Sequence, residues 1–199
     1  VLMTVFIICY AVKKYDILRF RFGRHMIERS VIGEGFRLSI PPTIQSSLSA
    51  FGGLLLQNFM NGFGTQTVAA ITTAYRVDTI ILLPIINLSS GISTMVAQGY
   101  GAGDMKRVRK LLMVGMVMMV CVSLILTIVV IPTGGSLVAM FGVGEEATMI
   151  GRGFFYRIAG FYVVYGLSMA IRGALEGIGD MTYSSIAGVL SLVARIVLS

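Results

Sequence analysis

The sequence contains no tryptophan, one histidine and two cysteines among its 199 residues, so side chains for metal binding or nucleophilic chemistry are scarce. Cys9 and Cys121 lie in separate apolar runs, and two thiols supply neither a disulfide framework nor a complete metal site. We expect both to be buried as small apolar packing residues. His25 lies in a basic connector and has no evident nucleophile to activate. We therefore predict no catalytic residue, no metal, no cofactor and no enzymatic activity.

Charged residues are also few. They make up 13% of the chain, compared with about a quarter in ordinary soluble proteins. Hydrophobic residues make up 56%, and the mean hydropathy is +0.87. This composition indicates a membrane protein, and the 24 glycines favour close packing of helices within the bilayer. The formal charge of +7 comes from basic residues beside apolar runs, without an aromatic–basic module, so nucleic acid is not expected as a partner.

Apolar runs of about 20 residues divide the chain into predicted membrane-spanning helices. Residues 1–12 supply the end of one span, and residues 13–37 form a basic connector that is either an interfacial amphipathic helix or a solvated loop. Further spans are predicted over residues 38–62, 66–98, 111–131 and 153–171, and from Ser184 onward. The chain opens and stops inside apolar runs, which is typical of a fragment of a longer protein.

Two prolines bear on the longer spans. At about 1.5 Å per residue, the 66–98 helix exceeds a bilayer core of about 30 Å, so it must tilt, bend or project. Pro84 is the expected kink because proline removes one hydrogen bond of the helix. Pro132 is expected to end the 111–131 span, and a loop over 133–150 then follows.

The distribution of lysine and arginine predicts the orientation. The connectors at 13–37, 104–110 and 172–182 hold seven, four and one basic residues, and they fall on the same side if the spans alternate. The opposite connectors, 62–66 and 133–150, hold none. Basic residues accumulate in cytoplasmic loops, so we expect the first three connectors to be cytoplasmic in a multi-pass protein of the cytoplasmic (plasma) membrane.

Several polar residues interrupt the apolar spans, where they are costly unless they face protein, water or a ligand. The candidates for a ligand or ion pathway are Asp78, Arg76, Tyr75, Gln45, Asn58, Asn61 and Arg157. Asp78 is the only acidic residue inside a predicted span, so it is the first candidate for a cation or proton site. In the 153–171 span, the tyrosines could stack on a cationic ligand or line the membrane interface; they are Tyr156, Tyr162 and Tyr165.

Each of these polar residues also has a structural explanation. Arg76 and Asp78 lie about 200° apart around one helix, so they do not face each other, and each needs a partner elsewhere. Such partners could make ion pairs that hold helices together, or both side chains could snorkel to the interface. The carboxamides of Gln45, Asn58 and Asn61 could hydrogen-bond between helices, since such bonds are common in membrane proteins.

Five segments resemble the bacterial multidrug and toxic compound extrusion (MATE) transporters. They read PPTIQSSL, QNFMNGFGTQTVAA, AYRVDTIILLP, STMVAQGYGAGDMKRVRK and RGALEGIGDMTYSS, and together they cover most of residues 37–185. The resemblance implies an all-α, polytopic membrane helix bundle: part of one six-helix lobe in a twelve-helix, two-lobe transporter. Residues 1–12 would end the sixth helix, residues 13–37 would link the lobes, and residues 38–199 would form helices seven to ten and the start of eleven.

The resemblance also implies a function. Members of this family export organic cations and other toxic compounds in exchange for protons or sodium, by alternating access. The partners would then be a small organic cation, the lipid bilayer and a missing N-terminal lobe of the same chain. Some members place acidic coupling residues on helices seven and ten, yet residues 38–62 and 153–171 contain none. Coupling would then fall to Asp78 or to a carboxylate of the missing lobe.

Two alternatives to the exporter remain open. The first is a lipid-linked oligosaccharide flippase of the same superfamily, in which Arg76 and Arg157 would help to neutralise phosphates. The second is a membrane remnant or scaffold that does not transport.

Overall fold

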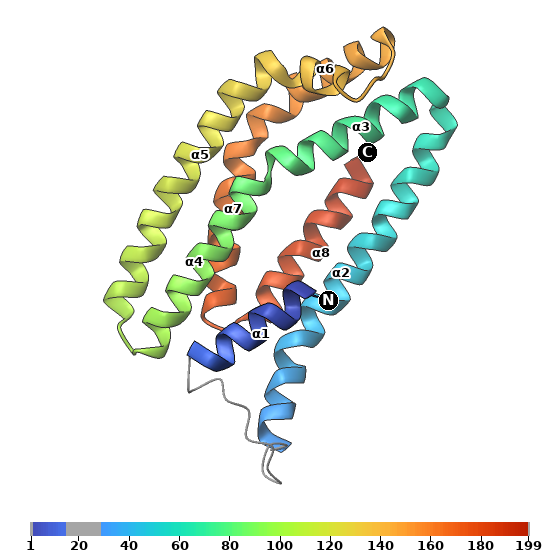
Figure 1. The fold of residues 1–199 in the computed structure, drawn as a ribbon. Coiled ribbons are helices and arrows are strands. Elements are labelled where there is room, and N and C mark those ends of the chain that lie inside the picture. Colours follow the sequence, from blue (N-terminus) through green and yellow to red (C-terminus); the bar gives the residue numbers. More distant parts are fainter. Residues whose placement is uncertain (1, 15–28, 199) are drawn as a thin grey trace. The chain divides into compact units, whose positions relative to one another are not determined.

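A computed structural model describes residues 2–14 and 29–198, and every regular element within these ranges is a helix, which confirms the all-α prediction (Figure 1). The helices are α1 (Leu2–Lys14), α2 (Arg29–Met60), η2 (Asn61–Phe63), α3 (Thr65–Ile81), α4 (Leu83–Gly101), α5 (Met105–Ala139), α6 (Glu145–Ile158), η3 (Ala159–Phe161), α7 (Tyr162–Gly177) and α8 (Met181–Leu198).

The chain separates into two compact units, Val1–Arg37 and Leu38–Ser199. The first contains α1 and the opening turns of α2, which are exposed. Most of the predicted basic connector lies outside the described residues. Its last part is helical, because α2 already begins at Arg29 and not near Leu38. The second unit contains every pocket and site considered below.

The break between α3 and α4 confirms the kink predicted near Pro84. The two helices are bent by 40° at Leu82, and Pro84 lies in the first turn of α4 (Figure 1). Proline has no N–H to donate to the preceding turn, so it is well tolerated in the first turn of a new helix, where that hydrogen bond is not needed. The Leu82 N–H still donates to the Asp78 carbonyl at 2.9 Å, which keeps the ends of the two helices joined.

The prediction that Pro132 ends a helix was wrong, because α5 continues through it to Ala139. The Thr133 hydroxyl donates to the Val129 carbonyl at 2.6 Å, which adds a local hydrogen bond beside the proline. The turns beyond the proline are held by packing on α6, where Gly134 lies against Phe155. The predicted 133–150 loop therefore shrinks to the short connection between α5 and α6.

Among the described residues, two segments are long and apolar enough to cross a membrane, Met105–Ala139 and Glu145–Gly177. The bent pair α3–α4 makes a third if it counts as one span. The predicted 153–171 span is thus the centre of a longer segment, formed by α6, η3 and α7. In contrast, α2 is not among these segments because polar residues between Thr43 and Asn58 lower its hydropathy.

Two buried clusters form the core of the second unit. One surrounds Phe155 and joins α3, α5, α6 and α7, and the other surrounds Ile85 and Met119 and joins α4, α5 and α7. Small residues bring the helices close together, as is typical of packing in membranes. A side-chain carbon placed on Gly115, for example, would lie 2.8 Å from Ile92.

The outer faces of the helices are apolar as well, which corrects the expectation for the two cysteines. Cys9 and Cys121 are both exposed and not buried. In a bilayer an apolar run covers the lipid side of a helix as readily as its core side, so membership of such a run does not predict burial.

Candidate functional site

The central feature of the site is a buried carboxylate bonded to a tyrosine of another helix. Asp78 lies on α3 with 8% of its surface exposed, and Tyr162 opens α7 with 2% exposed. The Tyr162 hydroxyl donates to Asp78 Oδ1 at 2.6 Å. One partner of Asp78 is therefore a hydroxyl on α7. This short hydrogen bond ties α3 to α7.

Asp78 faces a cavity of about 470 Å³ between α3–α4 and the α6–α7 segment. Its lining consists of Tyr75, Asp78, Thr79, Leu82, Ile86, Ile158, Phe161, Tyr162 and Tyr165. Four of these nine side chains are aromatic, and one carries the carboxylate. Aromatic faces attract cations, and a cavity of a few hundred Å³ accommodates a small organic molecule. The arrangement can therefore hold an organic cation with its charge near Asp78.

Local geometry explains why these residues converge. On α3, Tyr75, Asp78, Thr79 and Leu82 follow the i, i+3, i+4, i+7 spacing that places side chains on one helix face. Across the cavity, the 3₁₀ turn η3 interrupts the segment between α6 and α7. The hydroxyl of Thr127, on α5, donates to the Ala159 carbonyl of that turn at 2.9 Å, so the interruption remains satisfied inside the protein.

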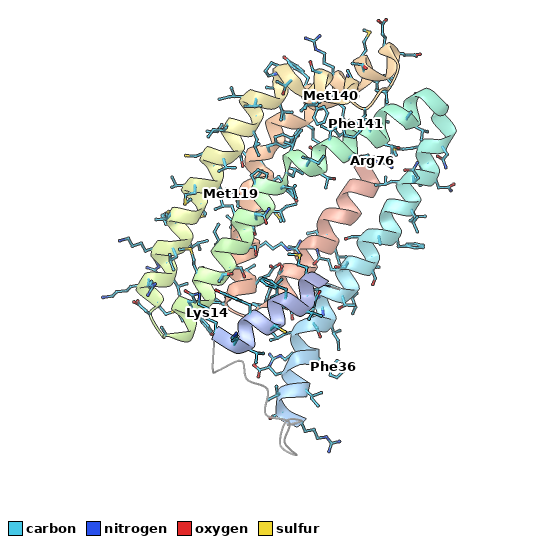
Figure 2. The ribbon with its side chains drawn as sticks, viewed as in Figure 1. Lys14, Phe36, Arg76, Met119, Met140 and Phe141 are labelled. Carbon is cyan, nitrogen blue, oxygen red and sulfur yellow. The ribbon has the colours of Figure 1, made fainter. Side chains whose placement is uncertain are left out.

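The other predicted site residues do not join Asp78 and Tyr75. Arg76 is exposed on a different side of α3, and it lines a separate pocket of about 570 Å³ with Asn61 (Figure 2). Asn61 also accepts from the Gln57 carboxamide at 3.5 Å. Asn58 and Arg157 are exposed on α2 and α6. The structure thus brings two of the seven candidates to the central cavity and leaves five elsewhere.

Gln45 belongs to a polar cluster that the sequence did not predict as a group. Arg172 Nη2 donates to Gln45 Oε1 at 2.8 Å, and Arg172 Nε donates to Glu176 Oε1 at 2.9 Å. The Ser184 hydroxyl donates to the same Glu176 oxygen at 2.8 Å. The cluster therefore joins α2, α7 and α8. Only the Arg172–Glu176 pair was visible in the sequence, as an i, i+4 spacing of opposite charges.

This cluster borders a second large cavity, of about 600 Å³, between α2, α7 and α8. Gln45 and Arg172 line it, while Glu176 does not. Phe161 and Tyr165 line both this cavity and the one at Asp78. The two cavities thus share an aromatic wall on the α7 side, with a carboxylate facing one cavity and a guanidinium facing the other.

Replacing Arg172 by leucine is expected to destabilise the protein by about 1–2 kcal/mol. The substitution removes the guanidinium that pairs with Glu176 and donates to Gln45, and the ion pair is only about one-third exposed (31% and 32%). The measurement is the melting temperature of the full-length protein in detergent. Arg157→Leu removes the same charge from an exposed position, and its effect should stay within about 0.5 kcal/mol. Equal effects of the two substitutions would contradict a stabilising role of the cluster.

The MatE family model matches residues 41–199. The multidrug export protein MepA of Staphylococcus saprophyticus is 23% identical over 198 residues, which are 98% of this chain and 43% of that protein. An outward-facing multidrug resistance MATE family transporter of the MOP superfamily superposes with a TM-score of 0.78 at 24% identity, over 83% of this chain and 37% of that one.

A second solved structure shows the same fold with a different binding pocket. This MOP superfamily transporter from Pyrococcus furiosus, described as having a pocket of reverse polarity that suggests a different function, superposes with a TM-score of 0.78 at 24% identity. The match covers 83% of this chain and 36% of that one. In all three comparisons the chain spans about two-fifths of the relative's length.

Proposed function

This chain belongs to the MatE family, and from that premise we propose that it is part of an ion-coupled antiporter that exports organic cations by alternating access. MatE proteins are transporters, in agreement with the prediction that the chain is not an enzyme. The transporter would be completed by a second lobe, since the chain spans about two-fifths of its relatives. Residues 1–12 would end a helix of that lobe, and residues 13–37 would link it to this one.

The buried carboxylate of Asp78 carries the proposal. An organic cation and a coupling ion, proton or sodium, both compensate a negative charge, so each would displace the other from the same carboxylate. The cavity supports this exchange because aromatic rings surround Asp78 and can face the organic cation directly. Binding of the coupling ion would also change the charge of the Asp78 group that accepts the hydrogen bond of the Tyr162 hydroxyl. The α3–α7 contact would then respond to which ion is bound.

The arrangement of the connections supports the proposed membrane orientation. In the second unit, the α4–α5 and α7–α8 turns lie at one end, and the α2–α3 and α5–α6 turns lie at the other (Figure 1). Residues 104–110, with four basic side chains, follow the α4–α5 turn. We therefore propose that 104–110 and 172–182 lie on the cytoplasmic side of the plasma membrane. The basic side chains of 13–37 favour the same side by composition alone.

The direct test uses the full-length protein in proteoliposomes loaded with a fluorescent organic cation. A proton gradient and then a sodium gradient would be imposed across the membrane. We expect one of them to drive efflux that stops when an ionophore collapses that gradient. Efflux that persists without either gradient would contradict ion coupling, and no efflux under any condition would contradict cation export.

A flippase for lipid-linked oligosaccharides is the second candidate, and the cationic side chains of the pockets favour it. Arg172 lines the second cavity and Arg76 lines the pocket near Asn61. Guanidinium groups suit phosphates. The same proteoliposomes, prepared with a labelled polyprenyl-phosphate sugar, distinguish the two functions. Movement of the lipid without movement of the organic cation would favour the flippase.

A further inference from the structure

A groove of about 450 Å³ lies at the start of α5, and none of its lining residues lines the Asp78 cavity. It is lined by Met105, Lys106, Arg109, Lys110 and Met113. All five residues are exposed. Lys106, Arg109, Lys110 and Met113 follow the i, i+3, i+4, i+7 spacing, so three cations and a methionine occupy one face of the helix.

The charge of this groove is poorly compensated by its own helix. The first turn of α5 contains no acidic residue, and Asp104, which precedes it, accepts the Arg107 N–H at 2.9 Å as the helix cap. A helix N-terminus already carries partial positive charge, so lysines and arginines there are unfavourable unless an anion approaches them. The groove therefore presents a concentrated positive potential and favours an anionic occupant.

An apolar stripe continues from the groove along the same face of α5. Met113, Val117, Leu124 and Ile128 are 57%, 58%, 46% and 70% exposed. At about 1.5 Å per residue, α5 is about 52 Å long, whereas a hydrocarbon core is about 30 Å thick. The basic first turns of α5 can therefore lie at the level of the headgroups while the stripe lies in the acyl region.

We propose that this groove binds an anionic phospholipid, with the phosphate headgroup against Lys106, Arg109 and Lys110 and an acyl chain along the stripe below. A second copy of the chain would bring the same positive charge to the same place, and a soluble anion would leave the stripe uncovered. A phospholipid with a negative headgroup complements both parts. The site depends on the membrane placement of α5 and not on what the protein transports.

Two arginines in one turn provide a matched test. Arg109 lines the groove, whereas Arg107 is also exposed and does not line it. In the full-length protein, Arg109→Gln is expected to weaken retention of phosphatidylglycerol by about fivefold, the effect of one basic residue at an anionic membrane surface. Arg107→Gln should change it by less than about twofold. The triple variant K106Q/R109Q/K110Q should weaken it by at least about tenfold.

Native mass spectrometry in detergent measures retention, with phosphatidylcholine and water-soluble glycerol phosphate as the other probes. The melting temperature without added lipid checks that each variant is folded. Preferential retention of phosphatidylglycerol that is lost in Arg109→Gln and kept in Arg107→Gln supports the site. Equal loss in both arginine variants would overturn it in favour of unspecific attraction, and equal binding of glycerol phosphate would reduce it to an anion site. Loss of a dimer from the triple variant, with lipid still retained, would assign the face to a second copy.

Discussion

Replacing Asp78 by asparagine should lower gradient-driven export of an organic cation by at least about tenfold, equivalent to about 1.4 kcal/mol. The carboxamide oxygen can still accept from the Tyr162 hydroxyl, so the α3–α7 contact is expected to survive. What disappears is the negative charge that an organic cation and a coupling ion would share. The measurement is efflux from proteoliposomes containing the full-length variant, at matched protein density and with the same imposed gradient.

Asp104→Asn is the matched control for this substitution. It also converts an aspartate of the same unit into asparagine, but at an exposed helix cap, where asparagine serves as well as aspartate. Efflux should remain within about twofold of the unmodified protein. Unchanged efflux in Asp78→Asn would move ion coupling to a carboxylate of the other lobe. Equal loss in both variants would show that the assay reports folding and not the charge of the cavity.

Replacing Gly173 by alanine is expected to cost about 1–3 kcal/mol of stability, the range for overpacking a tight interior. A side-chain carbon at this position would lie 2.5 Å from the Ser89 carbonyl oxygen and 2.7 Å from the Ser89 hydroxyl oxygen. That hydroxyl donates to the Met169 carbonyl at 2.6 Å, so Ser89 cannot turn away without losing a bond between α4 and α7. The melting temperature in detergent should therefore fall, because α4 and α7 must separate.

Gly91→Ala provides the comparison for Gly173→Ala. Gly91 lies on α4, and no atom stands within 4 Å of where its side-chain carbon would be. The substitution should be neutral or should stabilise the helix by up to about 1 kcal/mol, since alanine favours helices more than glycine does. A loss of stability at Gly91 equal to that at Gly173 would contradict the argument from close packing.

The sequence predicted features that depend on local chemistry better than those that depend on packing. Pro84 breaks the helix as predicted, since the missing N–H acts within its own turn. Pro132 does not, because the packing of Gly134 on Phe155 holds the following turns in place. That contact joins residues of two separate helices, so no local sequence pattern predicts it.

The same distinction applies to the candidate site. Asp78 and Tyr75 were singled out because a polar group in an apolar helix is costly wherever it lies. Tyr162, which donates to Asp78, was interpreted as one of several interfacial or stacking tyrosines, since nothing in its own segment points to α3. The contact between Gln45 and Arg172 joins positions 127 residues apart in the sequence, and it could be seen only after α2 and α7 were placed together.

The aromatic wall shared by the two cavities couples their shapes. Phe161 and Tyr165 have a surface on each side, so a rotation of either ring that enlarges one chamber narrows its neighbour. Two molecules that bind in different cavities, without touching each other, could thus compete through these two rings. Inhibition of one compound by a different one would then depend on how easily these two rings rotate, and not on whether the two binding sites overlap.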